Sequence, residues 1–277
     1  MRIRFGYRIR YQIPQRVSMV FLLHAQPRAD QSLVRQDVMA TRPQTPIETY
    51  QDFFGNTCAR LVAEPGTLEL STDALLEDPG TVERACYDAR EVPVEELPPE
   101  ALQFLMPSRY CESDLLLSEA WSRFGGVSGG WNRVQAICDF VNARTQFGYQ
   151  FARTTKTALE TFSERRGVCR DMAHLAIAFC RALNIPARYC TSYLGDIGVP
   201  VVEAPMDFAA CIEVYLGGEW HVFDPRNNQR RIARLLVARG RDAADIAIST
   251  SFGPAFIQTF EVHTELAEAE GRLEHAA

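Results

Sequence analysis

The feature that most constrains the fold is an apolar helix pattern followed by strand patterns between residues 169 and 225. Residues 169–183 carry apolar side chains around most of the helix, so this helix is expected to be largely buried. Residues 188–194 predict a strand, and residues 207–216 and 219–225 predict two more around the pair Gly217-Gly218. A two-residue glycine connection is typical of a tight β-hairpin. Helices that precede an antiparallel sheet predict an α+β domain.

The N-terminal part of the chain shows strand patterns and no helix periodicity. Apolar residues alternate with arginines over residues 3–11, which predicts a half-buried strand. Turn sequences interrupt this region repeatedly, so we expect a β-sandwich domain over residues 1–80. Acidic residues and prolines predict a linker over residues 81–98. Residues 99–277 are expected to form the core domain, which begins with helices over 99–105, 113–124, 131–144 and 157–163.

Composition excludes several classes of protein. The net charge of -6, from 35 acidic and 29 basic residues, argues against nucleic-acid binding because phosphates require a basic surface. No apolar stretch reaches the roughly 18 residues of a membrane span. The glycines of residues 125–130 lack the lysine and hydroxyl residue of a phosphate-binding loop, so we expect no nucleotide and no other cofactor.

The cysteines indicate a reducing environment. Eight cysteines are scattered through apolar segments without a CxxC pair, so we expect reduced packing residues and no metal site. The basic N-terminus and the apolar run 17–23 superficially resemble a signal peptide, but the run is short and no A-x-A sequence follows. Residues 17–24 predict a strand instead. We therefore favour a cytoplasmic location without membrane association.

Cys169 is the cysteine with the clearest chemical potential. It begins the predicted helix 169–183, where the helix dipole and free N–H groups stabilise a thiolate. The dipole contributes only about 0.3–1 kcal/mol, so it lowers the thiol pKa slightly. Cys169 is thus a candidate nucleophile, with a buried structural thiol as the alternative. We expect it to be the most reactive of the eight cysteines.

A resemblance to a known family rests on two segments. The first is GVCRDMAHLAIAFCRALNIPARYCTSYL, which is similar to the core of the transglutaminase-like superfamily of cysteine peptidases and acyltransferases. The second is PMDFAACIEVYLGGEWHVFDPRNN, which is similar to that family's histidine strand, glycine turn and aspartate strand. Residues 1–80 resemble the β domain of bacterial members. The resemblance implies an N-terminal β-sandwich followed by a papain-like core of helices packed on an antiparallel sheet, with Cys169 as nucleophile and Asp224 as the aspartate that orients the histidine.

The chain departs from the family pattern at one position, where Ala209 stands in place of the histidine. A two-residue turn at Gly217-Gly218 pairs Leu216 with Glu219, so positions that pair along the hairpin add up to 435. The side chains of residues 207, 209, 211, 222, 224 and 226 then share one face of the sheet. The carboxylates of Asp207 and Asp224 are therefore expected on the face that would carry the family's imidazole at position 209.

The other histidines do not fill this gap. His221 is an odd number of residues from Asp224 on one strand and therefore points to the opposite face. His174 lies about 140° around the helix from Cys169. Asp207 is on the same face as Asp224, and we expect Asp207 and Arg170 to contact substrate.

Three functions remain open from the sequence. The first is hydrolysis or acyl transfer at amide or peptide bonds through Cys169, weakened because acid–base transfer typically contributes about 10²–10⁴ in rate. The second is a catalytically degenerate, peptide-binding module. The third is a structural or assembly role. A peptide or protein is the expected substrate, peptide-ligating proteins are expected companions, and the sequence leaves the oligomeric state open.

Overall fold

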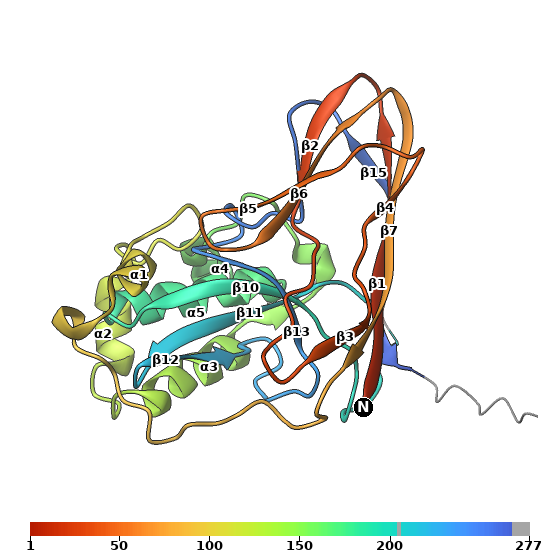
Figure 1. Cartoon of the computed structure of the whole chain (residues 1–277). Coiled ribbons are helices and arrows are strands. Elements are labelled where there is room, and N and C mark those ends of the chain that lie inside the picture. Colours follow the sequence, from red (N-terminus) through yellow and green to blue (C-terminus); the bar gives the residue numbers. More distant parts are fainter. Residues whose placement is uncertain (204–205, 268–277) are drawn as a thin grey trace, which may run out of the picture.

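The computed structural model describes residues 1–203 and 206–267, with two sheets packed as a sandwich beside a core of helices and a third sheet (Figure 1). One sandwich sheet has the order β15-β1-β7-β3, with β4 also paired to β7, and the other has the order β14-β2-β6-β5. The bounds of these strands are Arg2–Ile13 (β1), Val17–Phe21 (β2), Ser32–Arg35 (β3), Ala40–Arg42 (β4), Glu48–Gln51 (β5), Thr57–Ala63 (β6), Gly66–Glu77 (β7), Ser249–Ser251 (β14) and Phe256–Leu266 (β15).

The core is an antiparallel sheet with the order β12-β11-β10-β13, covered by helices, which confirms the expected α+β class. Its strands are Ala187–Tyr193 (β10), Ala209–Leu216 (β11), Glu219–Phe223 (β12) and Leu235–Gly240 (β13), and a small parallel pair joins Gln146–Phe147 (β8) to Arg166–Gly167 (β9). The helices are Val94–Glu96 (η1), Pro99–Leu102 (α1), Gln103–Leu105 (η2), Leu117–Phe124 (α2), Trp131–Arg144 (α3), Tyr149–Phe151 (η3), Ala158–Glu164 (α4) and Cys169–Ala182 (α5). Within the described part of the chain, no helix combines the length and the apolar composition that crossing a membrane requires.

The alternating pattern at the N-terminus forms β1 as predicted. The apolar side chains at the odd positions from Ile3 to Ile13 are at most 2% exposed, and Tyr11 contacts Phe21 across the two sandwich sheets. The arginines on the other face pair with acidic residues of β7, as in the 2.8 Å contact between Arg10 and Glu69. Period-two alternation thus separates a buried face from a charged face on one strand.

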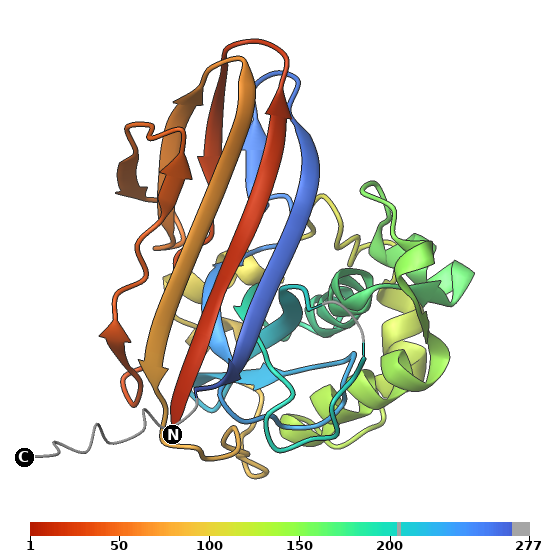
Figure 2. The same cartoon turned by 90° about the vertical axis from the view of Figure 1, so that its right-hand side faces the viewer.

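The predicted domain boundary is wrong at the C-terminal end. Strand β15 pairs with β1 along residues Phe256–Leu266, and β14 pairs with β2, so both strands complete the N-terminal sandwich. Figure 2 shows β7, β1 and β15 as long strands lying side by side. The assignment of residues 99–277 to one core domain therefore fails for 249–266. The physical reason is that β1 has two edges to pair, and β7 satisfies only one of them.

The central helix α5 is buried along most of its length, as its apolar pattern predicts. Every residue from Asp171 to Ala182 is buried. Arg181, near the end of α5, donates hydrogen bonds to the carbonyl oxygens of Ala187, Met106 and Arg241, which compensates its burial. The helix predicted to start after Ser113 instead begins at Leu117, because Glu112 to Leu115 form a turn.

The predicted linker, residues 81–98, is attached to the core instead of being a free tether. Glu83 accepts a 2.6 Å hydrogen bond from buried Arg234, and its backbone N–H donates to the carbonyl of Arg231. Further along, the carbonyl of Arg90 accepts from the N–H of Gly217 at 2.8 Å. This segment is therefore held at Glu83 against the residues that precede β13 and at Arg90 against the turn of the β11–β12 hairpin.

Candidate active site

The β11–β12 hairpin has the register that the sequence predicts. Gly217 and Gly218 have φ values of 60° and 95°, a left-handed conformation that glycine adopts without strain. Leu216 pairs with Glu219, and Ile212 pairs with Phe223. Extending this register places Asp224 opposite Cys211, as expected.

The end of β12 leaves one backbone donor of β11 unpaired. The pair next to a two-residue turn is hydrogen-bonded, so the even-numbered residues of β11 direct their N–H groups toward β12. The pairing of the two strands ends at Ile212 and Phe223, before it reaches Ala210. The carbonyl of Pro225, which the register would place opposite Ala210, accepts a hydrogen bond from Asn142 at 3.1 Å. The N–H of Ala210 is thus available to the Cys169 sulfur, where it favours the thiolate.

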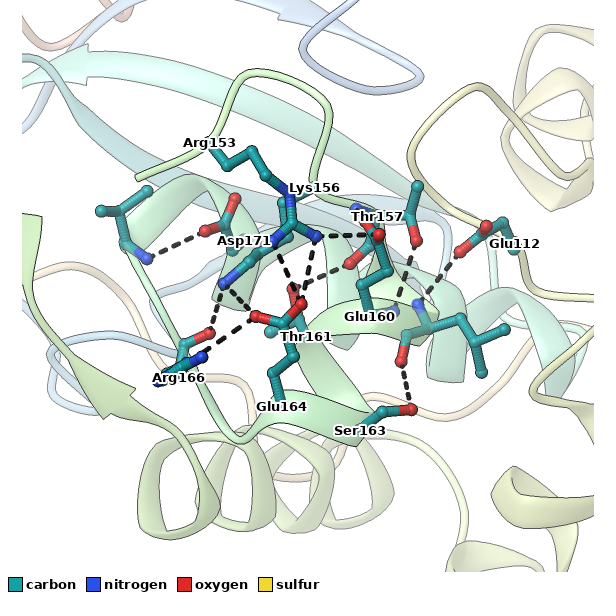
Figure 3. Close-up of polar contacts among 12 residues, drawn as sticks. Glu112, Arg153, Lys156, Thr157, Glu160, Thr161, Ser163, Glu164, Arg166 and Asp171 are labelled. Atoms are coloured by element: carbon teal, nitrogen blue, oxygen red, sulfur yellow. Dashed lines mark hydrogen bonds and ion pairs between the residues drawn. The ribbon is translucent and has the colours of Figure 1, made fainter. Parts of the chain in front are cut away.

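A polar network fixes the turn that precedes Cys169 (Figure 3). Lys156, which is 1% exposed, donates to the carbonyl oxygen of Arg166 at 2.9 Å and pairs with Glu164 at 3.0 Å. Helix α4 begins with a capping box, in which Thr157 and Glu160 exchange hydrogen bonds of 2.9 and 3.3 Å. These contacts hold both ends of the segment that leads into α5.

The first turn of α5 is organised by Asp171. Its carboxylate accepts the N–H of Val168 at 3.1 Å and two hydrogen bonds from Arg170. Gly167 allows this approach, because a Cβ there would lie 2.8 Å from an Asp171 carboxylate oxygen. Arg170 also donates to the carbonyl of Arg153 at 2.5 Å. The guanidinium of Arg170, expected to contact substrate, is therefore committed to the protein in this structure.

The electrostatic environment of Cys169 differs from the expectation. Burial is the main cause that raises the pKa of its thiol to about 11, and the carboxylates of Asp207 and Asp224 add to the rise. The N–H groups of Ala210 and Arg170 act in the opposite direction. The lowering expected from the helix N-terminus is present in the N–H of Arg170, but desolvation exceeds it and the net pKa is raised. At neutral pH the nucleophile candidate is a protonated thiol.

The carboxylate of Asp224 is fully engaged. One oxygen accepts the N–H groups of Arg226 and Asn227, and the other accepts the Asn227 amide at 2.8 Å and the Arg234 guanidinium at 2.7 Å. The side chains of Asp224 and Arg234 are 1% and 5% exposed. Asp224 thus lies near Cys169 as the resemblance implies, but with all its acceptor sites occupied.

No histidine of the described chain serves Cys169. His174 accepts the N–H of Ala243 at 3.1 Å and stacks on Tyr110, while His221 lies 3.1 Å from the carbonyl oxygen of Leu216. His24 and His263 lie beside carboxylates of the sandwich, and His275 falls outside the described residues. Ala209, which precedes the donor Ala210, adds no titratable group.

Two groups near the thiol are acidic or phenolic. Burial raises the pKa of Asp207, whose carboxylate accepts the N–H of Phe208 at 2.6 Å. Burial also raises the pKa of Tyr149, and the charges of Asp207 and Cys169 contribute to that rise. Cys169, Asp207, Asp224 and Tyr149 therefore lie close enough for their charges to affect one another's pKa values, and we call these four residues the Cys169 neighbourhood.

Replacing Asp207 with asparagine is expected to lower the pKa of the Cys169 thiol, because the change removes a negative charge that disfavours the thiolate. Alkylation of Cys169 by iodoacetamide at pH 8 should accelerate about threefold to tenfold. The measurement is peptide mass mapping of sub-stoichiometric labelling. The matched control is Asp114→Asn, a change at an exposed carboxylate, which should leave the rate unchanged. Equal rates in Asp207→Asn and the native chain would show that Asp207 does not act on the sulfur.

Sequence reasoning missed three residues in or next to the Cys169 neighbourhood. Tyr149 lies in no motif and is recognised only because η3 brings it near Asp207 and Cys169. Arg234 and Asn227 bind Asp224, yet their spacing from it follows no periodic pattern. The sole signal was the adjacency of Asn227 to the predicted aspartate strand. Within the described chain, one group of side chains could hold a metal ion, Cys86, Glu219 and His221, and it involves none of the site residues.

Comparisons with known proteins show the family and the fold. The family model of the transglutaminase-like superfamily matches residues 122–225. A crystal structure of a candidate cysteine protease from Cytophaga hutchinsonii is 32% identical, with a TM-score of 0.83, and the match covers 98% of this chain and 92% of that chain. An uncharacterised protein from Mycobacterium leprae is 25% identical over 229 residues, which are 78% of this chain and 81% of that protein. Another from Mycobacterium tuberculosis is 36% identical over 113 residues, 37% of this chain and 36% of that protein.

Proposed function

The chain belongs to the transglutaminase-like superfamily, and from this premise we propose that it cleaves or transfers acyl groups through a thioester on Cys169. The observation that carries the proposal is the position of Cys169, which begins α5 with the free N–H of Ala210 directed at its sulfur. The sulfur attacks the carbonyl carbon of a peptide or protein substrate. The carbon–leaving-group bond breaks and the leaving group departs with the proton that the thiol gives up; water or an amine then takes the acyl group and returns a proton to the sulfur.

The N–H groups around the sulfur suit this chemistry. The donors of Ala210 and Arg170 stabilise negative charge at the thiolate, and the same donors can stabilise the oxyanion that forms when the carbonyl is attacked. They supply no proton to a leaving amine. The absence of the family's histidine at Ala209 therefore predicts that amides react slowly, whereas acyl groups with good leaving groups react readily.

A second candidate function is peptide binding without turnover. Two observations favour it: Ala209 replaces the acid–base group, and Asp224 has no acceptor site left for an imidazole. In this case the residues around Cys169 would bind a peptide or acyl group for another protein, such as a peptide-ligating enzyme.

The free thiols of all eight cysteines support the proposal that either function operates in the cytoplasm.

The test uses an ester whose leaving group needs no protonation. Incubation of the native chain with p-nitrophenyl acetate should release p-nitrophenolate and leave one acetyl group per chain, mapped to Cys169 by mass spectrometry. Cys169→Ser should lose this adduct, whereas Cys86→Ser, a change at the other half-buried cysteine, should retain it. Native and Cys169→Ser chains with the same acetylation pattern would contradict the enzyme proposal and favour peptide binding.

A further inference from the structure

The side chains of Cys86, Glu219 and His221 converge at the turn end of the β11–β12 hairpin. Each offers one ligand atom, and these atoms all lie within 4.8 Å of one another. A nitrogen of His221 lies 3.9 Å from a carboxylate oxygen of Glu219. We propose that these three residues form a binding site for a zinc-class divalent cation, separate from the Cys169 neighbourhood.

The backbone explains why these residues meet. Glu219 and His221 are two residues apart on β12, so their side chains point to the same face of the strand. Cys86 comes from the segment 81–98, which forms a turn where the N–H of Ala89 donates to the carbonyl of Cys86 at 2.9 Å. The next residue, Arg90, accepts the N–H of Gly217 in the hairpin turn. All three ligands are therefore positioned by hydrogen-bonded backbone.

The donor set fits zinc chemistry. Thiolate sulfur, imidazole nitrogen and carboxylate oxygen are the usual ligands of Zn²⁺, at about 2.0–2.3 Å from the ion. Tetrahedral coordination at those bond lengths separates neighbouring ligand atoms by about 3.3–3.8 Å. Ligand atoms within 4.8 Å of one another would have to approach by up to about 1.5 Å on binding. Binding releases the Cys86 thiol proton, since the thiolate is the ligand.

The surroundings of His221 and Glu219 are compatible with an ion. The ring of His221 is buried and held edge-on by Trp131, and its Nε2 lies 3.1 Å from the Leu216 carbonyl oxygen, which accepts its proton while no ion is bound. Arg84 contacts Glu219 at 3.4 Å, but its side chain is 74% exposed and free to move into water. The cation would take over this role as the partner of Glu219.

A fourth coordination position would remain open. Glu219 and His221 line a cavity of about 380 Å³ that also contacts Arg84 and the Cys190–Cys211 strand pair. Three protein ligands and an accessible fourth position are typical of zinc sites that bind water or a small ligand. The ion would also join the segment 81–98 to the hairpin that carries Ala209, which reinforces the attachment at Arg90.

The experiment titrates the tag-free, chelator-treated full chain with Co²⁺ and then with Zn²⁺. A single site with Cys86 as ligand predicts a thiolate-to-cobalt charge-transfer band that saturates at one equivalent and disappears on addition of Zn²⁺. Glu219→Gln, a change at an exposed side chain, should weaken Co²⁺ binding at least tenfold without unfolding the chain. Cys86→Ser should abolish the band, and Cys169→Ser should leave it intact.

Two outcomes would overturn the proposal. A native chain that gives no charge-transfer band at a tenfold excess of Co²⁺ has no such site. A band that persists in Cys86→Ser, or that has the same affinity in Glu219→Gln, comes from other thiols. Because the readout is metal binding and Cys169→Ser is the control, the result is independent of whether Cys169 is catalytic.

Discussion

Histidine in place of Ala209 is expected to raise hydrolysis of short peptide p-nitroanilides by about 10²–10⁴-fold, the usual contribution of general acid–base transfer. Residue 209 directly precedes Ala210, whose N–H faces the Cys169 sulfur, so an imidazole there would lie near the thiol. It would take the thiol proton and return one to the leaving amine. The measurement is the kcat/KM of purified native and Ala209→His chains.

The control variants distinguish proton transfer by the imidazole from the effect of a larger side chain at position 209. Ala209→Asn introduces a side chain of similar size without a base and should give no gain, and Cys169→Ala/Ala209→His should lose the gain. Because the Asn227 amide occupies an oxygen of Asp224, Ala209→His/Asn227→Ala should exceed the single variant, since the carboxylate can then orient the ring. An equal gain in Ala209→Asn, or native hydrolysis as fast as that of Ala209→His, would contradict this interpretation.

Replacement of Asp224 with alanine is expected to lower the free energy of unfolding by about 3–5 kcal/mol. The reason is the buried pair with Arg234, whose nitrogen lies 2.7 Å from the carboxylate; without Asp224, the guanidinium keeps only Glu83 as a charged partner. Urea denaturation of the two chains measures the effect. Asp224→Leu/Arg234→Met should recover part of the loss, because it removes the buried guanidinium that has lost one of its two carboxylate partners.

The matched control for this prediction is Asp114→Ala, which removes an exposed carboxylate and should change the free energy of unfolding by less than about 0.5 kcal/mol. A loss below about 1 kcal/mol in Asp224→Ala would show that the Arg234 pair contributes little. Asp224 would then be retained for another reason, such as its position beside Cys169.

The parts of the fold governed by local rules were predictable from the sequence. A two-residue glycine turn fixes the pairing of its strands, so the register from Leu216–Glu219 to Ile212–Phe223 followed from Gly217-Gly218 alone. The capping box at Thr157 defined the start of α4, and apolar periodicity defined α3. In each case, the determining contacts lie within a few residues of one another.

The parts governed by distant contacts were not predictable. The pairing of β15 with β1 joins residues more than 240 positions apart. Within β15 only Val262 and Thr264 are fully buried, so the strand carries little apolar alternation in its sequence. The Arg234–Asp224 pair depends on how β13 approaches the end of β12. The net rise of the thiol pKa was not predictable, because the sequence showed the helix N-terminus of α5, which lowers this pKa, and not the burial of the sulfur, which raises it more.

The central claim is that Cys169 is a nucleophile without its acid–base partner, and the pH dependence of its alkylation tests this most directly. The rate constant for iodoacetamide labelling of Cys169 in the native chain, followed by peptide mass mapping, should rise about tenfold per pH unit from pH 7 to 10, as for a thiol with a pKa of about 11. A plateau of high reactivity below pH 7, which marks a thiolate paired with a cation, would contradict it.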